Sequence, residues 1–151
     1  MTSKNQYKMH DKLDWGMDAT FVPNKRMPVY NWFYYKEGFS RQMVFNALEM
    51  LGAGKSRKAF VLDPFCGVGT TNLACRERVI NSVGFDVSPI ALFAARVKCR
   101  DYKPAKLKET LAALREAHFE PHDMSWIPGD IARFFNPHTL DDIVFFGREL
   151  K

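Results

Sequence analysis

The sequence predicts an α/β domain built on parallel β-strands. Residues 59–62 form an uninterrupted apolar run, as a parallel strand does when both of its faces are covered. A glycine-rich turn and a helical segment follow this run. Residues 82–87 and the apolar segment 90–99 then repeat the succession of strand and helix. A strand, a glycine turn and a helix N-terminus together form a site for the polar end of a nucleotide-like ligand.

The turn after the first strand is the most informative stretch. Pro64 ends the strand because proline has no N–H to donate to a neighbouring strand. Gly67 and Gly69 allow the backbone to turn tightly and to approach a bound molecule closely. Thr70 and Thr71 are expected to cap the helix that continues to residue 78.

Two phosphate-binding patterns fit this turn poorly. A dinucleotide fingerprint (G-x-G-x-x-G) requires a third glycine where Asn72 stands. A P-loop requires a glycine where Glu49 stands, and its remaining residues, Gly54-Lys55-Ser56, come before the strand instead of after it.

Residues 63–71 read DPFCGVGTT, which resembles the S-adenosylmethionine-binding motif of the amino-methylating DNA methyltransferases (D-P-F-x-G-x-G-T-T). These enzymes methylate an exocyclic amino group of adenine or cytosine. The resemblance implies the Rossmann-like fold of S-adenosylmethionine-dependent methyltransferases. It also implies that the cofactor-binding residues here are Asp63, Pro64, Phe65, Cys66, Gly67, Gly69, Thr70 and Thr71.

The segment 29–39 contains six aromatic residues, a density that usually indicates a buried core. It also resembles the family's second cofactor motif (Y-x-K-x-x-F-S), which in some members precedes the glycine motif. The matching residues are Tyr34, Tyr35, Lys36, Phe39 and Ser40. The Lys36 ammonium and the Ser40 hydroxyl are expected to meet the carboxylate of the cofactor.

Asp86 stands at the end of the second predicted strand, 17 residues after Gly69. In nucleotide-binding α/β domains an acidic residue at this place accepts hydrogen bonds from the ribose hydroxyls. Residues 84–89 also resemble the family's acidic motif (G-x-D-x-x-P), which implies that Asp86, Val87 and Ser88 contact the cofactor. The alternative is that Asp86 only caps the next helix. Ser88 followed by Pro89 can begin that helix unaided, which favours ribose binding.

Three further helices are predicted. One begins at an N-cap Ser40 and ends at Gly52. The second covers residues 104–119, and the third covers residues 139–150 with a capping-box-like pair, Thr139 and Asp142. Residues 120–137 read as a loop. His118 and His122 are separated by a proline and have no further ligand set, so no metal site is predicted.

Composition indicates one globular domain at most. The chain has 151 residues, of which 46% are hydrophobic and 26% charged, and no apolar run reaches the length of about 20 residues that a membrane span needs. Its three cysteines form no C-x-x-C pair, which argues against disulfides and zinc and favours a reducing, cytoplasmic location. The net charge of +5 suits a nucleic-acid partner.

Two divisions of the chain are predicted. Residues 1–28 are expected to be an irregular basic arm that either packs over an edge of the domain or contacts DNA. Residues 29–151 are expected to be a partial methyltransferase domain, its cofactor-binding half. The family's D/S/N-Pro-Pro-aromatic turn, which holds the flipped base, has no counterpart because none of the eight prolines are adjacent. The catalytic residues therefore stay unknown, and a second polypeptide or a C-terminal half is expected to complete the fold.

Three functions remain open. The first is the S-adenosylmethionine-binding portion of a site-specific DNA methyltransferase. The second is a fragment of an RNA (tRNA guanine) methyltransferase, since some of these enzymes resemble the same D-P-F-C-G stretch. The third is a catalytically silent cofactor-binding or interaction module.

Overall fold

A computed structural model of the chain describes residues 11–55, 58–117, 119 and 123–149. Its contacts group the chain into two compact units, residues 1–100 and residues 101–151. The glycine turn and both predicted strands belong to the first unit. The functional division that the sequence predicts at residue 28 stays a prediction.

The first unit contains a two-stranded parallel sheet, as the sequence predicts. Strand β1 (Phe60–Asp63) pairs with strand β2 (Asn81–Gly84) so that their first residues face each other. Strand β2 ends two residues earlier than Asp86. Two further backbone bonds continue the pairing past its end, because the Phe85 N–H donates to the Asp63 carbonyl at 2.9 Å and the Phe85 carbonyl accepts from the Cys66 N–H at 2.8 Å. The glycine turn is thereby tied to the end of β2.

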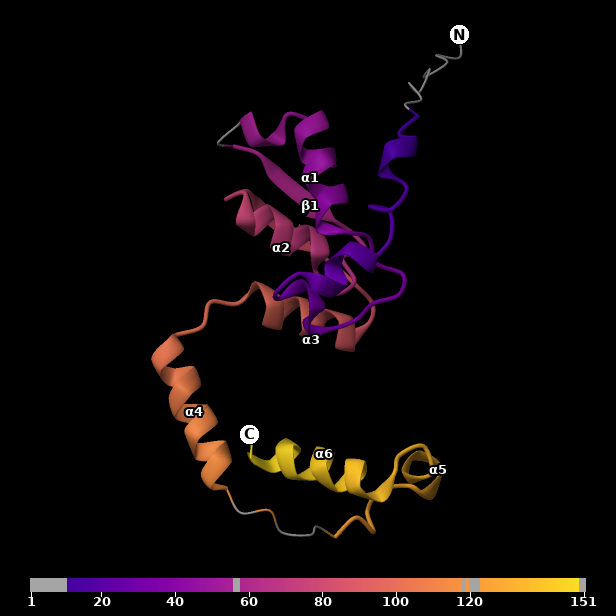
Figure 1. The fold of residues 1–151 in the computed structure, drawn as a ribbon, viewed down its shortest axis with the longest axis vertical. Helices are drawn as coiled ribbons and strands as arrows, with labels where there is room; N and C mark the ends of the chain where they lie inside the picture. Colours follow the sequence, from indigo (N-terminus) through magenta and orange to yellow (C-terminus); the bar gives the residue numbers. More distant parts are fainter. Residues whose placement is uncertain (1–10, 56–57, 118, 120–122, 150–151) are drawn as a thin grey trace. The chain divides into compact units, whose positions relative to one another are not determined.

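Three helices accompany the sheet in this unit (Figure 1). They are α1 (Arg41–Met50), α2 (Thr70–Glu77) and α3 (Pro89–Cys99). Helix α1 begins as predicted, because the Ser40 hydroxyl accepts a hydrogen bond from the Met43 N–H at 3.0 Å. The same arrangement begins α3, where Ser88 is the N-cap.

The predicted threonine caps of α2 are wrong. The N-cap of this helix is Gly69, whose backbone is left-handed with φ 78°, and no side chain caps the helix. Thr70 and Thr71 already lie inside the first helical turn, and both are buried.

Helices α1 and α2 cover one face of the sheet. Their buried side chains form a core with Val61 of β1 packed against it, and that core consists of Val44, Phe45, Leu48, Ala74 and Cys75. Side chains of a strand alternate between the two faces of its sheet. Phe60 and Leu62 accordingly lie on the opposite face, where they remain 64% and 60% exposed. No described element covers them.

In its described part, the segment before α1 contains three short 3-10 helices. These are η1 (Leu13–Trp15), η2 (Val22–Arg26) and η3 (Tyr30–Trp32), and a fourth, η4 (Ala53–Lys55), follows α1. Phe21 and Tyr30 are each only 3% exposed. Phe21 of the predicted arm and Tyr30, which lies beyond it, are therefore buried in this unit. Both alternatives for the arm, packing over an edge of the domain and contact with DNA, stay predictions.

The second unit is helical, with α4 (Pro104–Glu116), α5 (Gly129–Ala132) and α6 (Pro137–Glu149). The side chain of Asn136, and not the predicted pair Thr139 and Asp142, begins α6. Its Oδ1 accepts from the His138 N–H at 2.9 Å. The Phe145 ring is buried on α6.

His118 and His122 lie outside the described residues. Among the residues described, no helix combines the length and apolar character of a membrane span.

Candidate functional site

The glycine turn lies between the carboxyl ends of β1 and β2. Gly67 and Gly69 both have left-handed backbones, with φ 50° and φ 78°. A Cβ atom on Gly69 would lie 2.8 Å from the Cβ of Ala95 in α3, and one on Gly67 would lie 3.2 Å from the Tyr35 ring. Because these two glycines have no side chain, Ala95 and the Tyr35 ring can pack closely against the turn. The sequence alone does not reveal these contacts.

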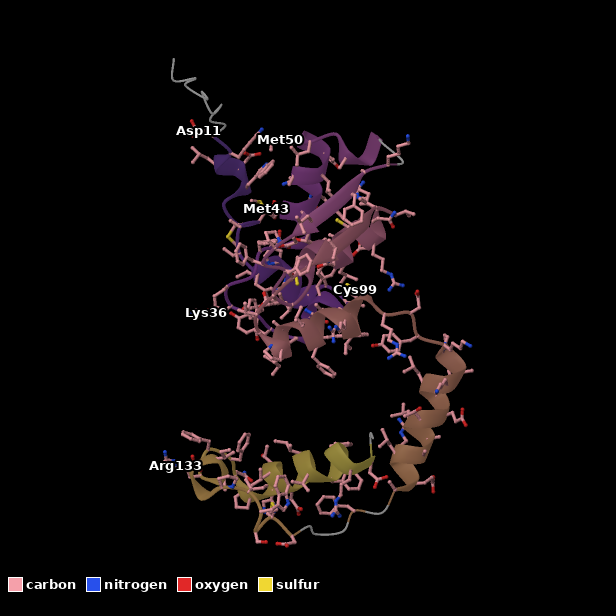
Figure 2. All side chains as sticks on the ribbon, turned by 180° about the vertical axis from the view of Figure 1, so that it is seen from behind. Asp11, Lys36, Met43, Met50, Cys99 and Arg133 are labelled. Atoms are coloured by element: carbon pink, nitrogen blue, oxygen red, sulfur yellow. The ribbon has the colours of Figure 1, made fainter. Side chains whose placement is uncertain are left out.

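Tyr35 brings the upstream aromatic segment to the glycine turn. Its half-buried ring is the neighbour of Gly67, so residues 32 positions apart in the sequence meet here. Lys36 follows at the surface (Figure 2). Tyr34 is 56% exposed, and the Lys25 Nζ lies 4.8 Å from the centroid of its ring, a cation–π geometry.

Asp86, two residues past the end of β2, contacts the same turn. Its Oδ2 accepts a hydrogen bond from the Gly67 N–H at 2.8 Å, and its Oδ1 accepts one from the Ser88 N–H at 2.8 Å. The predicted alternative, that Asp86 only caps the next helix, does not describe this arrangement. Ser88 caps α3 and Asp86 bridges to the glycine turn.

Ser40 is placed differently from the other predicted residues. It is fully buried, and its hydroxyl both caps α1 and donates to the Asp18 Oδ1 at 3.3 Å. Ser40 therefore fixes the start of α1 and is not presented to a ligand. Its neighbour Phe39 is half buried and packs against the core under α1.

The remaining predicted residues divide by exposure. Phe65 and Val87 project from the two strand ends and are 83% and 99% exposed, and Pro64 is exposed as well. Asp63 is half buried, and its Oδ1 accepts from the Phe65 N–H at 3.1 Å. The buried members are Cys66, Thr70 and Thr71.

The thiol of Cys66 is not an activated nucleophile. Burial raises its pKa, and the nearby carboxylates of Asp63 and Asp86 raise it further. A catalytic cysteine requires the opposite shift, because the thiolate is the reactive form. Cys66 therefore contributes packing to the turn.

Residues that the sequence did not single out hold the upstream segment in place. Asn24 is completely buried, and its side chain donates to the Phe39 carbonyl at 3.0 Å and accepts from the Arg41 N–H at 2.9 Å. The Tyr30 hydroxyl donates to Glu77 of α2 at 2.7 Å. An asparagine in an irregular stretch has no periodicity that could have marked it as buried.

An ionic contact strengthens the same attachment. The Arg41 Nε lies 2.9 Å from the Glu77 Oε2, so the two side chains form an ion pair. This nitrogen makes no hydrogen bond to a described residue. Burial and the hydrogen bond to Glu77 raise the pKa of the Tyr30 hydroxyl above its usual range. Tyr30 therefore stays protonated and remains a donor.

The arrangement suits binding better than covalent chemistry. The strand ends present a carboxylate, an aromatic ring and exposed apolar side chains close together. Among the described residues, no cluster of His, Cys, Asp or Glu side chains could hold a metal ion. Two of the larger cavities lie along the sheet. One of about 510 Å³ is beside β2 and is lined in part by Cys66 of the glycine turn and by Gly84, the last residue of β2, and an apolar one of about 560 Å³ is beside β1. The candidate site is thus exposed at Phe65 and Val87 and adjoins the cavity beside β2.

Comparison with known proteins yields similarity to methyltransferases. The chain is 34% identical over 138 residues to the type II methyltransferase M.BsoBI of Geobacillus stearothermophilus. It is 36% identical over 107 residues to M.MjaII of Methanocaldococcus jannaschii, and 36% identical over 89 residues to M.AvaI of Nostoc sp., both also type II methyltransferases.

These matches cover 85%, 69% and 58% of this chain, but only 25%, 19% and 17% of the relatives' own lengths. The chain thus corresponds to about a quarter or less of each relative. No protein-family profile matches it, and no solved structure does. The resemblance to methyltransferases that the glycine-turn motif predicts is confirmed by these relatives.

Proposed function

We propose that this chain is the S-adenosylmethionine-binding portion of a DNA methyltransferase that modifies an exocyclic amino group of adenine or cytosine. One observation carries the proposal. Three segments that resemble cofactor motifs converge at the strand ends, through the contact of Tyr35 with Gly67 and the bond from Gly67 to Asp86. The similarity to type II methyltransferases supports the reaction class.

The residues at the strand ends fit the parts of the cofactor. An ionised carboxylate offers about four acceptor positions, and Asp86 uses two, which leaves two for ribose hydroxyls. The exposed side chains of Phe65 and Val87 offer apolar surface to a purine ring. Lys36 supplies a cation for the cofactor's carboxylate.

Bound S-adenosylmethionine would supply an activated methyl group. The residues of this chain would orient the cofactor, with Asp86 and the glycine turn fixing its position and with the buried Thr70 and Thr71 supporting the turn from within. A target amine would have to be aligned with that methyl group, so that positioning and exclusion of water lower the barrier. Residues 1–151 contain no Pro-Pro-aromatic turn, and the groups that would hold the base are therefore proposed to come from the structure that completes the sheet.

DNA is the proposed substrate. The type II methyltransferase relatives favour it over RNA and over a silent binding module. The net charge of +5 is compatible with a polyanionic partner.

Calorimetry tests the cofactor assignment. S-adenosylmethionine should bind the wild-type chain in a one-to-one complex. Asp86→Ala should weaken binding by roughly 10- to 100-fold, because charge-assisted hydrogen bonds to the ribose are lost. Asp130→Ala, an exposed aspartate of the second unit, is the matched control and should bind as the wild type does. Equal affinity of the Asp86→Ala and wild-type chains would exclude the ribose role.

We further propose that additional β-structure, from a second polypeptide or a further part of the protein, completes the sheet. The edge of β1 that faces away from β2 has no described strand paired with it. The apolar cavity of about 560 Å³ lies along this edge, between β1 and α1. An unpaired strand edge beside apolar surface is a template for a further strand.

The unpaired edge of β1 predicts how the chain associates in solution. The isolated chain should self-associate or require a partner, because Phe60 and Leu62 present apolar surface to water. Leu62→Lys should reduce self-association in sedimentation experiments. Phe93→Lys should not, because Phe93 on α3 is similarly exposed but does not lie beside the unpaired edge of β1. A compact monomer at all concentrations would contradict this expectation.

A further inference from the structure

The Asp86 carboxylate joins two parts of the candidate site before any ligand is present. We propose that Asp86 is a positioning residue for the glycine turn, in addition to the ribose contact assigned above. The ligand in this inference rests on the proposed function, but the positioning itself is a property of the unliganded protein.

The geometry ties the turn to the end of the sheet. Gly67 donates its N–H to the Asp86 Oδ2 at 2.8 Å, across 19 positions of sequence. The backbone next to Asp86 is itself held in place, because the preceding Phe85 forms backbone hydrogen bonds with both Asp63 and Cys66. Its second oxygen accepts from the Ser88 N–H at the start of α3. One carboxylate thus holds the turn, the end of β2 and the start of α3 in register.

Gly67 needs such an external contact. A glycine has more backbone freedom than any other residue, and Gly67 adopts φ 50° within a turn that contains a second glycine. Gly67 is buried, so its N–H would be left without an acceptor if the carboxylate were removed. The Tyr35 ring closes the other side of Gly67. The turn is therefore held on one side by a hydrogen bond and on the other by packing.

The two roles of Asp86 are compatible. The hydrogen bonds to Gly67 and Ser88 occupy one position on each oxygen, and each oxygen keeps one further lone pair for a hydroxyl donor. The same carboxylate can therefore hold the turn and receive a ribose, with no rearrangement between the two states. A site formed in advance loses less conformational entropy when its ligand binds.

Hydrogen exchange of the Gly67 amide in the unliganded protein tests the positioning role. Asp86→Ala should accelerate exchange at Gly67 on the order of 10- to 100-fold, because the charge-assisted bond is lost. Asp86→Asn retains one carbonyl acceptor and should restore part of the protection. The amide of Leu73, which bonds to the Gly69 carbonyl inside α2, should keep its wild-type rate in both variants.

Asp63→Ala is the matched control. Asp63 also stands at a strand end and also accepts a backbone N–H two residues later, but no hydrogen bond to Gly67 is observed. Its replacement should leave exchange at Gly67 unchanged. If Asp86→Ala exchanges at Gly67 as slowly as the wild type, or if Gly67 and Leu73 accelerate equally, the positioning role is excluded. Should Asp86→Ala fail to fold, the Asn variant decides the question by the same comparison.

A second measurement separates positioning from ribose binding. S-adenosylhomocysteine and an analogue lacking both ribose hydroxyls are titrated into wild-type and Asp86→Ala protein. If Asp86 acts only through the ribose, the substitution should not weaken binding of the analogue further. If it also positions the turn, the analogue should lose at least a few-fold in affinity. Failure of the wild type to bind S-adenosylhomocysteine at all would refute the proposed function, while the exchange experiment would still test Asp86.

Discussion

At the scale of single residues, close packing governs the glycine turn. The Cα of Gly69 lies so near α3 that an added Cβ would be 2.8 Å from the Ala95 Cβ and 3.0 Å from its Cα. The partner is partly backbone, so it cannot move aside as a flexible side chain can. Gly69 therefore combines two requirements, a left-handed φ of 78° and the absence of a side chain.

Three glycines separate these two requirements experimentally. Gly69→Ala should lower the free energy of unfolding by about 2–4 kcal/mol, because strain and overlap add. Gly52→Ala has a positive φ but open space, and should cost about 1–2 kcal/mol. Gly54→Ala has neither problem and should stay within about 1 kcal/mol of the wild type. Urea denaturation would measure all three, and an equal effect at Gly52 and Gly69 would argue against the packing explanation.

Lys98 carries an amine that is normally charged, but it lies in a buried position. It lies on α3 but is only 5% exposed, with its Nζ 3.5 Å from the Phe33 carbonyl. Burial lowers the pKa of this amine to about 8, from an ordinary value of 10.5. Between these two values the unfolded chain binds more protons than the folded one. Stability should therefore rise with pH in this window and should be lowest, as far as Lys98 is concerned, below it.

The Lys98→Met variant tests this linkage. Between pH values of about 7 and about 9.5, the stability of the wild type should gain about 1–2 kcal/mol relative to the variant. Comparing the two proteins cancels the titration of other groups that both retain. Parallel pH profiles of wild type and Lys98→Met would contradict the buried-amine assignment.

The sequence predicted the local chemistry of the site better than its contacts. It indicated Asp86, Gly67 and Tyr35 as one site, but the reason it offered for the glycine, approach to a bound molecule, missed the Tyr35 ring. The burial of Lys98 and Asn24 was also missed, because charge and polarity normally indicate exposure. Such contacts join residues far apart in sequence, where no local periodicity operates.

At the scale of elements, the strong signals were sufficient to predict which segments are helices and strands. The apolar run at 59–62 and the caps Ser40 and Ser88 identified β1, α1 and α3. The errors occurred at element ends. Capping was assigned to Thr70 and Thr71 because threonine caps helices often, but a left-handed glycine began α2 instead. At α6, Asn136 performs the capping expected of Thr139.

The element that most affects the site is the segment before α1. It carries Tyr35 to the glycine turn, and it is held by the bonds of Asn24 to Phe39 and Arg41 and by the bond of Tyr30 to Glu77 of α2. A cofactor motif that precedes the glycine turn in sequence can therefore contribute to the same site only while this segment stays attached. The buried polar contacts of Asn24 thus support the site at a distance.

At the scale of the whole molecule, the first unit has one covered and one bare sheet face. In the described part of the chain no further strand pairs with β1 or β2, and Phe60 and Leu62 remain largely open to water. A sheet of this size rarely stands alone. The chain spans only about a quarter of the length of M.BsoBI.

The most direct test of the central claim is a titration of isotope-labelled protein with S-adenosylmethionine, followed amide by amide by NMR. The account predicts saturable shifts concentrated at Tyr35, Gly67 and Asp86, with the amides of α6 unchanged. The absence of shifts, or shifts confined to residues away from the strand ends, would contradict the assignment of this site as the cofactor-binding surface.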